Sequence, residues 1–267
     1  MSTATLAPSL VRALPSSSRS FAELLERLRI HRGPFALRET SRDARPYLIA
    51  GLARALRRPT LVVVPTPDLA ERTFTDLSYY LAGERELEPA LVGAREESLG
   101  ALGSPSERSA RMSLLATLLA GRPLVAVAPL GALRQYVIPR AVFAAATSAI
   151  RAGDELDFEE LLARLHRLGY RRAEIVSAAG EFAVHGGIVD VWSATGEAPA
   201  RLEFFGDEVE SLRSFEVEHQ RSTGELAELV LVPWSEIPRD EAVRARVLAA
   251  IEGRPSVVAA ARNYLES

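Results

Sequence analysis

The stretch from Gly180 to Arg221 constrains the fold most, because it has the pattern of consecutive β-strands joined by short turns. Apolar residues alternate with small or polar ones up to a glycine pair at 186 and 187, and an extended run resumes over Ile188–Trp192. Two further strands are expected over Ala200–Phe205 and Glu208–Phe215, separated by a Gly-Asp turn. The sequence therefore predicts a mainly antiparallel sheet in this region.

The third of these strands has two chemically different sides. Successive side chains in a strand point to opposite faces, so Leu202 and Phe204 share one face while Arg201 and Glu203 share the other. We expect the first face to pack on a core and the second to present a basic and an acidic group to solvent. The segment has no nucleophile with its base and no set of metal ligands, which is typical of a binding surface.

Upstream of residue 140, helices alternate with short apolar strands, the pattern of a parallel α/β domain. The expected elements are a strand over Phe35–Leu37, a helix opened by Pro46, a buried strand over Thr60–Val64, a helix over Leu69–Leu81, a helix from Ser104 to Gly121 and a strand over Pro123–Ala128. Farther along, the patterns predict a strand within 141–150, an amphipathic helix from Phe158 to Leu168, strands over Arg172–Val176 and Leu229–Val232, and a helix over Asp240–Ile251.

A strand-loop-helix order is the setting of a phosphate-binding loop, so the loop from Leu37 to Ala44 is the place to look for one. Such a loop needs glycines for close backbone approach and a lysine for phosphate charge. This loop contains neither, and Glu39 and Asp43 would repel phosphate. Nucleotide hydrolysis is therefore disfavoured, although an ATP-binding motor domain whose loop has drifted stays open as an alternative.

Composition narrows the classes further. The chain has 267 residues, a net charge of −3 and no cysteine, which argues against a polyanion-binding protein and excludes disulfides and thiolate metal sites. All 32 basic residues are arginine, and the four histidines have no metal-binding spacing. No run approaches the length of a membrane span. We predict a cytoplasmic monomer without membrane contact, with no cofactor, metal or catalytic residue.

The strings FAVHGGIVDVW (182–192) and PARLEFFGDEVESLR (199–213), followed by QRS, resemble the second domain shared by two bacterial repair proteins. These are the transcription-repair coupling factor (Mfd) and the excinuclease protein UvrB, and the order of the preceding elements is more similar to the coupling factor. The resemblance extends over roughly residues 20–250. It implies a degenerate P-loop or helicase-like parallel α/β domain with an inserted smaller α+β domain built on the mainly antiparallel sheet.

The resemblance also implies a partner and a set of residues that bind it. In the family, charged residues at the positions of Arg172, Arg201 and Glu203 bind UvrA, the excinuclease protein that senses damage. Two further family positions correspond to Ala183 and His185. UvrB has arginine at both, and coupling factors generally keep arginine at the second. The predicted partner-binding set here is Arg172, His185, Arg201 and Glu203.

These inferences give a domain scheme and a functional hypothesis. Residues 1–20 are a mobile lead-in, residues 21–132 with 219–267 form the motor-like domain, and residues 133–218 form the inserted partner-binding domain. The hypothesis is a non-catalytic interaction module that recruits UvrA to stalled transcription complexes. The alternative is a cover that restrains a motor in a longer chain. Full coupling factors continue into modules for RNA polymerase and DNA, so this chain is expected to be either a fragment or a stand-alone relative.

Overall fold

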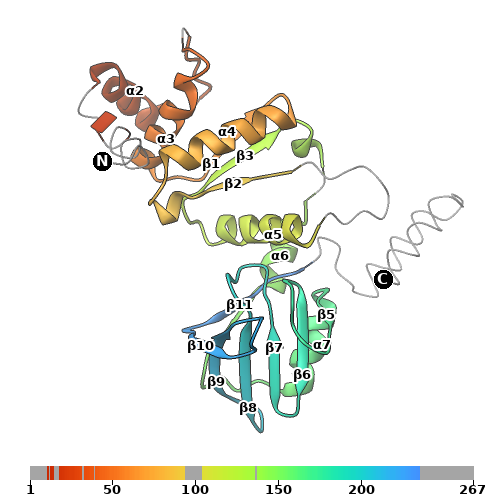
Figure 1. Ribbon diagram of the computed structural model, residues 1–267. Helices are drawn as coiled ribbons and strands as arrows, with labels where there is room; N and C mark the ends of the chain where they lie inside the picture. The colour runs from red at the N-terminus through yellow and green to blue at the C-terminus, as the bar shows by residue number, and fades with distance from the viewer. Residues whose placement is uncertain are drawn as a thin grey trace, which may run out of the picture. The chain divides into compact units, whose positions relative to one another are not determined.

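The computed structural model describes residues 11, 13–14, 18–31, 33–38, 40–93, 104–135 and 137–234. The chain divides into two units, one formed by residues 1–94 and 117–135 and the other by residues 95–116 and 136–267. Both contain helices and strands, as Figure 1 shows. The mixed α/β class predicted from the sequence is therefore confirmed. None of the described helices is long and apolar enough to cross a membrane.

A three-stranded parallel sheet organises the first unit, with β3 in its centre and β1 and β2 on either side. Its core is formed by the fully buried side chains of Leu77, Leu87, Val125 and Val127 together with Ala50 and Ala53 of α3. The elements are α2 (Arg19–Ile30), α3 (Ala44–Leu56), β1 (Thr60–Val64), α4 (Pro67–Tyr80), η1 (Arg85–Leu87), β2 (Pro89–Leu91), β3 (Val125–Pro129) and η2 (Ala132–Arg134), while α5 (Pro105–Leu119) crosses the division between the units.

Two expectations about this unit were wrong. Phe35–Leu37 does not form a strand, because no described strand pairs with it and its Phe35 and Leu37 side chains are 39% and 50% exposed. The loop that follows is therefore not preceded by a strand, as a phosphate-binding loop would be. Residues 60–64 do form a strand, but Leu61 and Val63 are exposed, so β1 is half-buried and not a fully buried strand.

The second unit is built on a six-stranded sheet in the order β10-β9-β8-β7-β6-β5, antiparallel except for the β5–β6 pair (Figure 1). A separate two-stranded sheet pairs β11 with β4. The elements are α6 (Arg140–Ala146), β4 (Ser148–Ile150), α7 (Phe158–Arg167), β5 (Arg171–Arg172), β6 (Glu181–His185), β7 (Ile188–Val191), β8 (Ala200–Phe205), β9 (Glu208–Phe215), β10 (Ser222–Glu225) and β11 (Leu229–Leu231). The predicted antiparallel run is confirmed.

Helix α7 covers one face of the six-stranded sheet. Asp157 caps the helix by accepting a hydrogen bond from Glu160 N at 2.7 Å. The Phe158 ring lies 5.2 Å from the Phe204 ring, and the His166 ring lies 5.0 Å from the Phe182 ring, in both cases edge to face. Leu202 is fully buried on the same side. The sequence pattern therefore assigned the core face of β8 correctly.

Residues beyond 219 continue in the second unit as far as they are described, although the sequence analysis placed them in the first domain. Strand β10 pairs with β9, and β11 pairs with β4. Trp234 N donates to Leu168 O at 2.8 Å, and the Trp234 ring packs so closely on Gly180 that a Cβ there would lie 2.1 Å from it. The predicted helix over 240–251 lies outside the described residues.

Candidate partner-binding surface

The side of the six-stranded sheet opposite α7 carries most of its charged side chains, and we call it the charged face. Residues directly opposite one another on paired strands point to the same side. One row across the strands consists of Ala183, Asp190, Arg201, Arg213 and Glu225. A second row consists of His185, Ile188, Glu203 and Ser211.

Arg201 and Asp190 form a two-pronged ion pair in the middle of this face. Arg201 Nε donates to Asp190 Oδ1 at 2.8 Å, and Arg201 Nη2 donates to Asp190 Oδ2 at 2.7 Å. The Asp190 side chain is 2% exposed and that of Arg201 is 20% exposed. The hydrogen bonds from Arg201 to Asp190 raise the pKa of the Arg201 guanidinium. Arg201 is therefore not the freely solvated charge that the sequence analysis expected.

The Arg201 guanidinium also covers an aromatic ring. Its Cζ lies 4.8 Å from the centre of the Phe215 ring, which is fully buried. Arg201 Nη1 further donates to the carbonyl oxygen of Gln220 at 3.3 Å. Cation–π contact and a planar fork of donors suit arginine to such a partly buried position. Arg201 thus ties β7, β8, β9 and the turn after β9 together.

The other residues of the predicted set occupy different environments. Glu203 is half-buried and accepts a hydrogen bond from Ser211 Oγ at 2.6 Å. His185 is exposed on the charged face at the start of the β6–β7 turn. Arg172 is exposed on the edge strand β5, but it lies opposite Phe182 and so belongs to the α7 side. The structure brings His185, Arg201 and Glu203 to one face and leaves Arg172 outside it.

Ala183 lies on the charged face but offers no exposed side chain. It is fully buried in a small apolar cluster with Val176 and Phe215, against which Trp192 packs. This position therefore contributes packing beneath the face and no charge to its surface.

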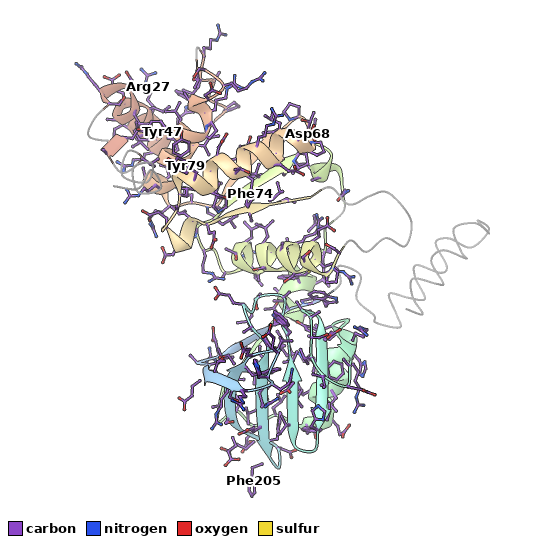
Figure 2. The ribbon with its side chains drawn as sticks, in the orientation of Figure 1. Arg27, Tyr47, Asp68, Phe74, Tyr79 and Phe205 are labelled. Atoms are coloured by element: carbon purple, nitrogen blue, oxygen red, sulfur yellow. The ribbon has the colours of Figure 1, made fainter. Side chains whose placement is uncertain are left out.

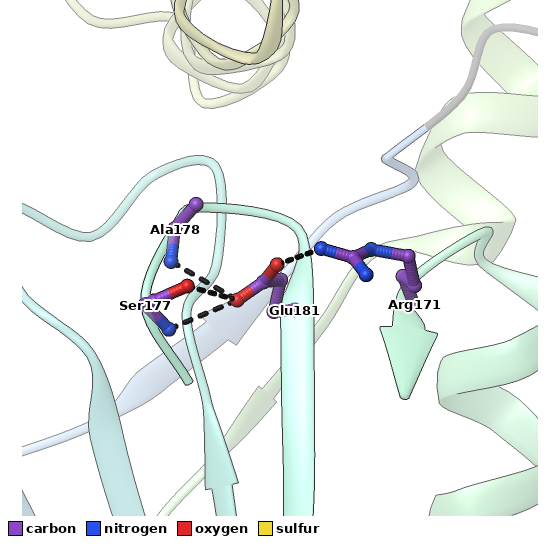
Figure 3. Close-up of polar contacts among 4 residues, drawn as sticks. All are labelled: Arg171, Ser177, Ala178 and Glu181. Carbon is purple, nitrogen blue, oxygen red and sulfur yellow. Dashed lines mark hydrogen bonds and ion pairs between the residues drawn. The ribbon is translucent and has the colours of Figure 1, made fainter. Parts of the chain in front are cut away.

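A buried carboxylate fixes the loop between β5 and β6, as Figure 3 shows. Glu181 accepts hydrogen bonds from Ser177 N at 2.9 Å, Ser177 Oγ at 3.0 Å and Ala178 N at 3.1 Å, and it pairs with Arg171. Burial alone would raise the pKa of Glu181, but these hydrogen bonds and the Arg171 charge outweigh it and lower the pKa. The chain therefore turns after Arg172, where the sequence predicted a strand continuing to residue 176.

Two exposed residues near the charged face were missed by the sequence analysis. Arg213 lies directly opposite Arg201, and within the described part of the chain its side chain makes no hydrogen bond or ion pair. Phe205 is 78% exposed at the tip of the β8–β9 hairpin. A two-residue turn alone would have placed Leu212 opposite Arg201, and the register shift between Glu203 and Phe204 brings Arg213 there instead, so the sequence pattern did not reveal Arg213. Alternation along β8 does place Phe205 on the same side as Glu203.

One acidic cluster in the turn after β9 also went unnoticed. Potential ligand atoms of Glu216, Glu218 and His219 lie within 4.8 Å of one another, and all three residues are exposed. His219 Nδ1 lies 3.3 Å from Glu216 Oε2. Exposed carboxylates gather in this way on many proteins without a metal, so we assign no function to the cluster.

Comparisons with known proteins relate the chain to bacterial repair proteins. Residues 149–236 match the family model of the UvrB interaction domain. The chain is 31% identical over 212 residues to the transcription-repair-coupling factor of Bacillus subtilis and 34% identical over 209 residues to that of Myxococcus xanthus. These alignments cover 79% and 76% of the chain but only 18% and 17% of the relatives. The coupling factor of Staphylococcus aureus (strain Mu50) is 29% identical over 231 residues, which is 85% of the chain and 20% of that protein.

Proposed function

We propose, on the premise that residues 149–236 belong to the UvrB interaction domain family, that this chain is a non-catalytic interaction module serving transcription-coupled DNA repair. Its partner in this proposal is the excinuclease protein UvrA. In a longer chain, RNA polymerase and DNA would bind other segments. The chain spans about a fifth of its curated relatives, so it corresponds to one module of such proteins.

The observation that carries this proposal is the charged face, which lies wholly within the matched residues. It combines exposed charged side chains with the largely buried ion pair of Arg201 and Asp190. Among the described residues, this face has no cleft lined by catalytic side chains. Ordered polar surfaces of this kind are typical of modest, non-obligate protein interfaces. In this proposal Arg201 shapes the face, while exposed neighbours such as His185 contact the partner.

The experiment that tests the proposal is a calorimetric titration of UvrA from the same organism into this chain. A modest interface predicts saturable one-to-one binding with a Kd on the order of 1–10 μM, weakening as salt is raised. Absence of saturable binding at about 100 μM would refute the proposal. Arg167→Ala is the matched control, because Arg167 is an exposed arginine on α7, on the opposite side of the sheet.

For the first unit we propose a motor-like fold that has lost its nucleotide site. The all-parallel order β1-β3-β2 and the helix α4 between β1 and β2 support this relationship. The sequence of the 37–44 loop, without glycine or lysine, supports the loss. Calorimetry with ATP and magnesium tests it, and saturable binding at millimolar ATP would contradict it.

A further inference from the structure

The centre of the charged face is chemically satisfied before any partner arrives. Asp190 and Arg201 bond to each other through two hydrogen bonds, and Glu203 accepts one from Ser211. A partner that covered these groups would remove water from them without supplying a missing bond. Strong binding therefore has to come from groups on this face that the fold itself does not use.

Phe205 is one such group. Its side chain is 78% exposed and projects from the tip of the β8–β9 hairpin, as Figure 2 shows. The hairpin is held in place: Leu156 N donates to Asp207 O at 2.7 Å, and Gly153 N donates to Val209 O at 2.8 Å. An aromatic ring on an already ordered hairpin loses little conformational freedom on binding, and such residues are common energetic centres of interfaces.

Arg213 is the second group. It is exposed on β9 directly opposite Arg201, and in the described part of the chain it has no ion pair, even with Glu225 across the β9–β10 ladder. Phe205 lies four positions beyond Arg201 on β8, so the Cα atoms of Phe205 and Arg213 are about 15 Å apart, given a strand rise of roughly 3.4 Å and a strand spacing of about 4.8 Å. One interface patch of about 800 Å² covers both.

We propose that Phe205 and Arg213 are the two anchors with which the charged face binds its protein partner. This inference rests on the proposed function and takes UvrA as the partner. The partner surface would offer an apolar pocket for the Phe205 ring and a carboxylate about 15 Å away for Arg213. Asp207 and Glu208 follow Phe205 closely in the sequence and are exposed. Basic side chains at the rim of the partner's pocket would therefore complement these two carboxylates. The same carboxylates repel phosphate, which makes a nucleic acid the wrong occupant.

The test is the titration with UvrA, repeated with Phe205→Ala, Arg213→Ala and the double variant. The matched controls are Val142→Ala, an exposed apolar residue on α6, and Arg167→Ala on α7. Each anchor variant is expected to weaken binding at least about tenfold, and each control by less than about twofold. Arg213→Ala should also flatten the salt dependence of Kd, whereas Phe205→Ala should leave it unchanged. Melting temperatures verify that the variants are folded.

The outcomes separate this inference from the proposed function. If the unmodified chain binds and both anchor variants bind within about twofold of it, the anchor assignment is overturned while the proposed function stands. If the controls weaken binding as much as the anchors, the assignment is also overturned. If the unmodified chain does not bind, both proposals fall. If Phe205→Ala instead weakens binding to a single-stranded oligonucleotide, the choice of a protein partner is wrong.

Discussion

We expect the replacement of Arg201 by Ala to lower the free energy of unfolding far more than a substitution at an exposed position would. The substitution leaves the Asp190 carboxylate, which is 2% exposed, without the two hydrogen bonds that neutralise it. It also removes the guanidinium that covers the buried Phe215 ring and the bond to Gln220 O. The hydrophobic cluster beneath the charged face would then be open to water at one point.

The size of the effect follows from the burial of the two partners. Removing one partner of a fully buried pair costs about 3–5 kcal/mol. Arg201 is 20% exposed, so water reaches the site after truncation and part of the penalty is recovered. We expect Arg201→Ala to lower the free energy of unfolding by about 2–4 kcal/mol. A surface substitution away from such features costs within about 0.5 kcal/mol.

Urea unfolding of the single variants Arg201→Ala and Asp190→Ala and of the double variant measures this energy as a double-mutant cycle. The double variant should be more stable than the sum of the single losses predicts, because neither charge is then left unpaired. Arg167→Ala on α7 is the control and should change stability by less than about 0.5 kcal/mol. A loss below about 0.5 kcal/mol for Arg201→Ala would refute the structural role of the pair.

Four further perturbations test other parts of the account. Leu202→Ala should lower the free energy of unfolding by about 2–5 kcal/mol, measured by urea denaturation, because Leu202 is fully buried. Gly180→Ala should destabilise by about 2 kcal/mol or more, seen as a lower Tm, since Gly180 has φ +86° and the Trp234 ring occupies the space of a Cβ. The pKa of Glu181 is lowered in the folded protein, so the stability that its carboxylate contributes is complete above the ordinary pKa of 4.5 and is lost as the pH falls through the folded-state pKa. Glu181→Gln should therefore weaken the dependence of the free energy of unfolding on pH in the acidic range. His185→Arg should tighten binding of UvrA a few-fold by supplying a fixed cation, and unchanged affinity would place this position outside the interface.

The local patterns of the sequence were sufficient for the second unit's main elements. Period-two alternation located β7, β8 and β9, and the amphipathic pattern from Phe158 to Leu168 located α7. The inward positions of Leu202 and Phe204 followed from the same alternation. Each of these features depends on residues within one element or one turn, so sequence alone contains the required information.

Features that depend on distant residues were not predictable in the same way. Alternation placed Arg201 on the side away from the core, but its pairing with Asp190 depends on the register across the 192–199 connection. The pairing of β11 with β4 joins residues about eighty positions apart, and no local pattern of the sequence indicates this contact. Phe35–Leu37 had a strand-like pattern and lacked a neighbouring strand to pair with among the described residues.

The central claim is that the charged face of the six-stranded sheet is the surface that binds UvrA. Hydrogen–deuterium exchange of this chain with and without saturating UvrA tests it most directly. The account predicts slower exchange in peptides that cover the β6–β7 turn and the β8–β9 hairpin, with α4 and α7 unchanged. Protection confined to α7 or to the first unit, with residues 185–213 unaffected, would contradict it.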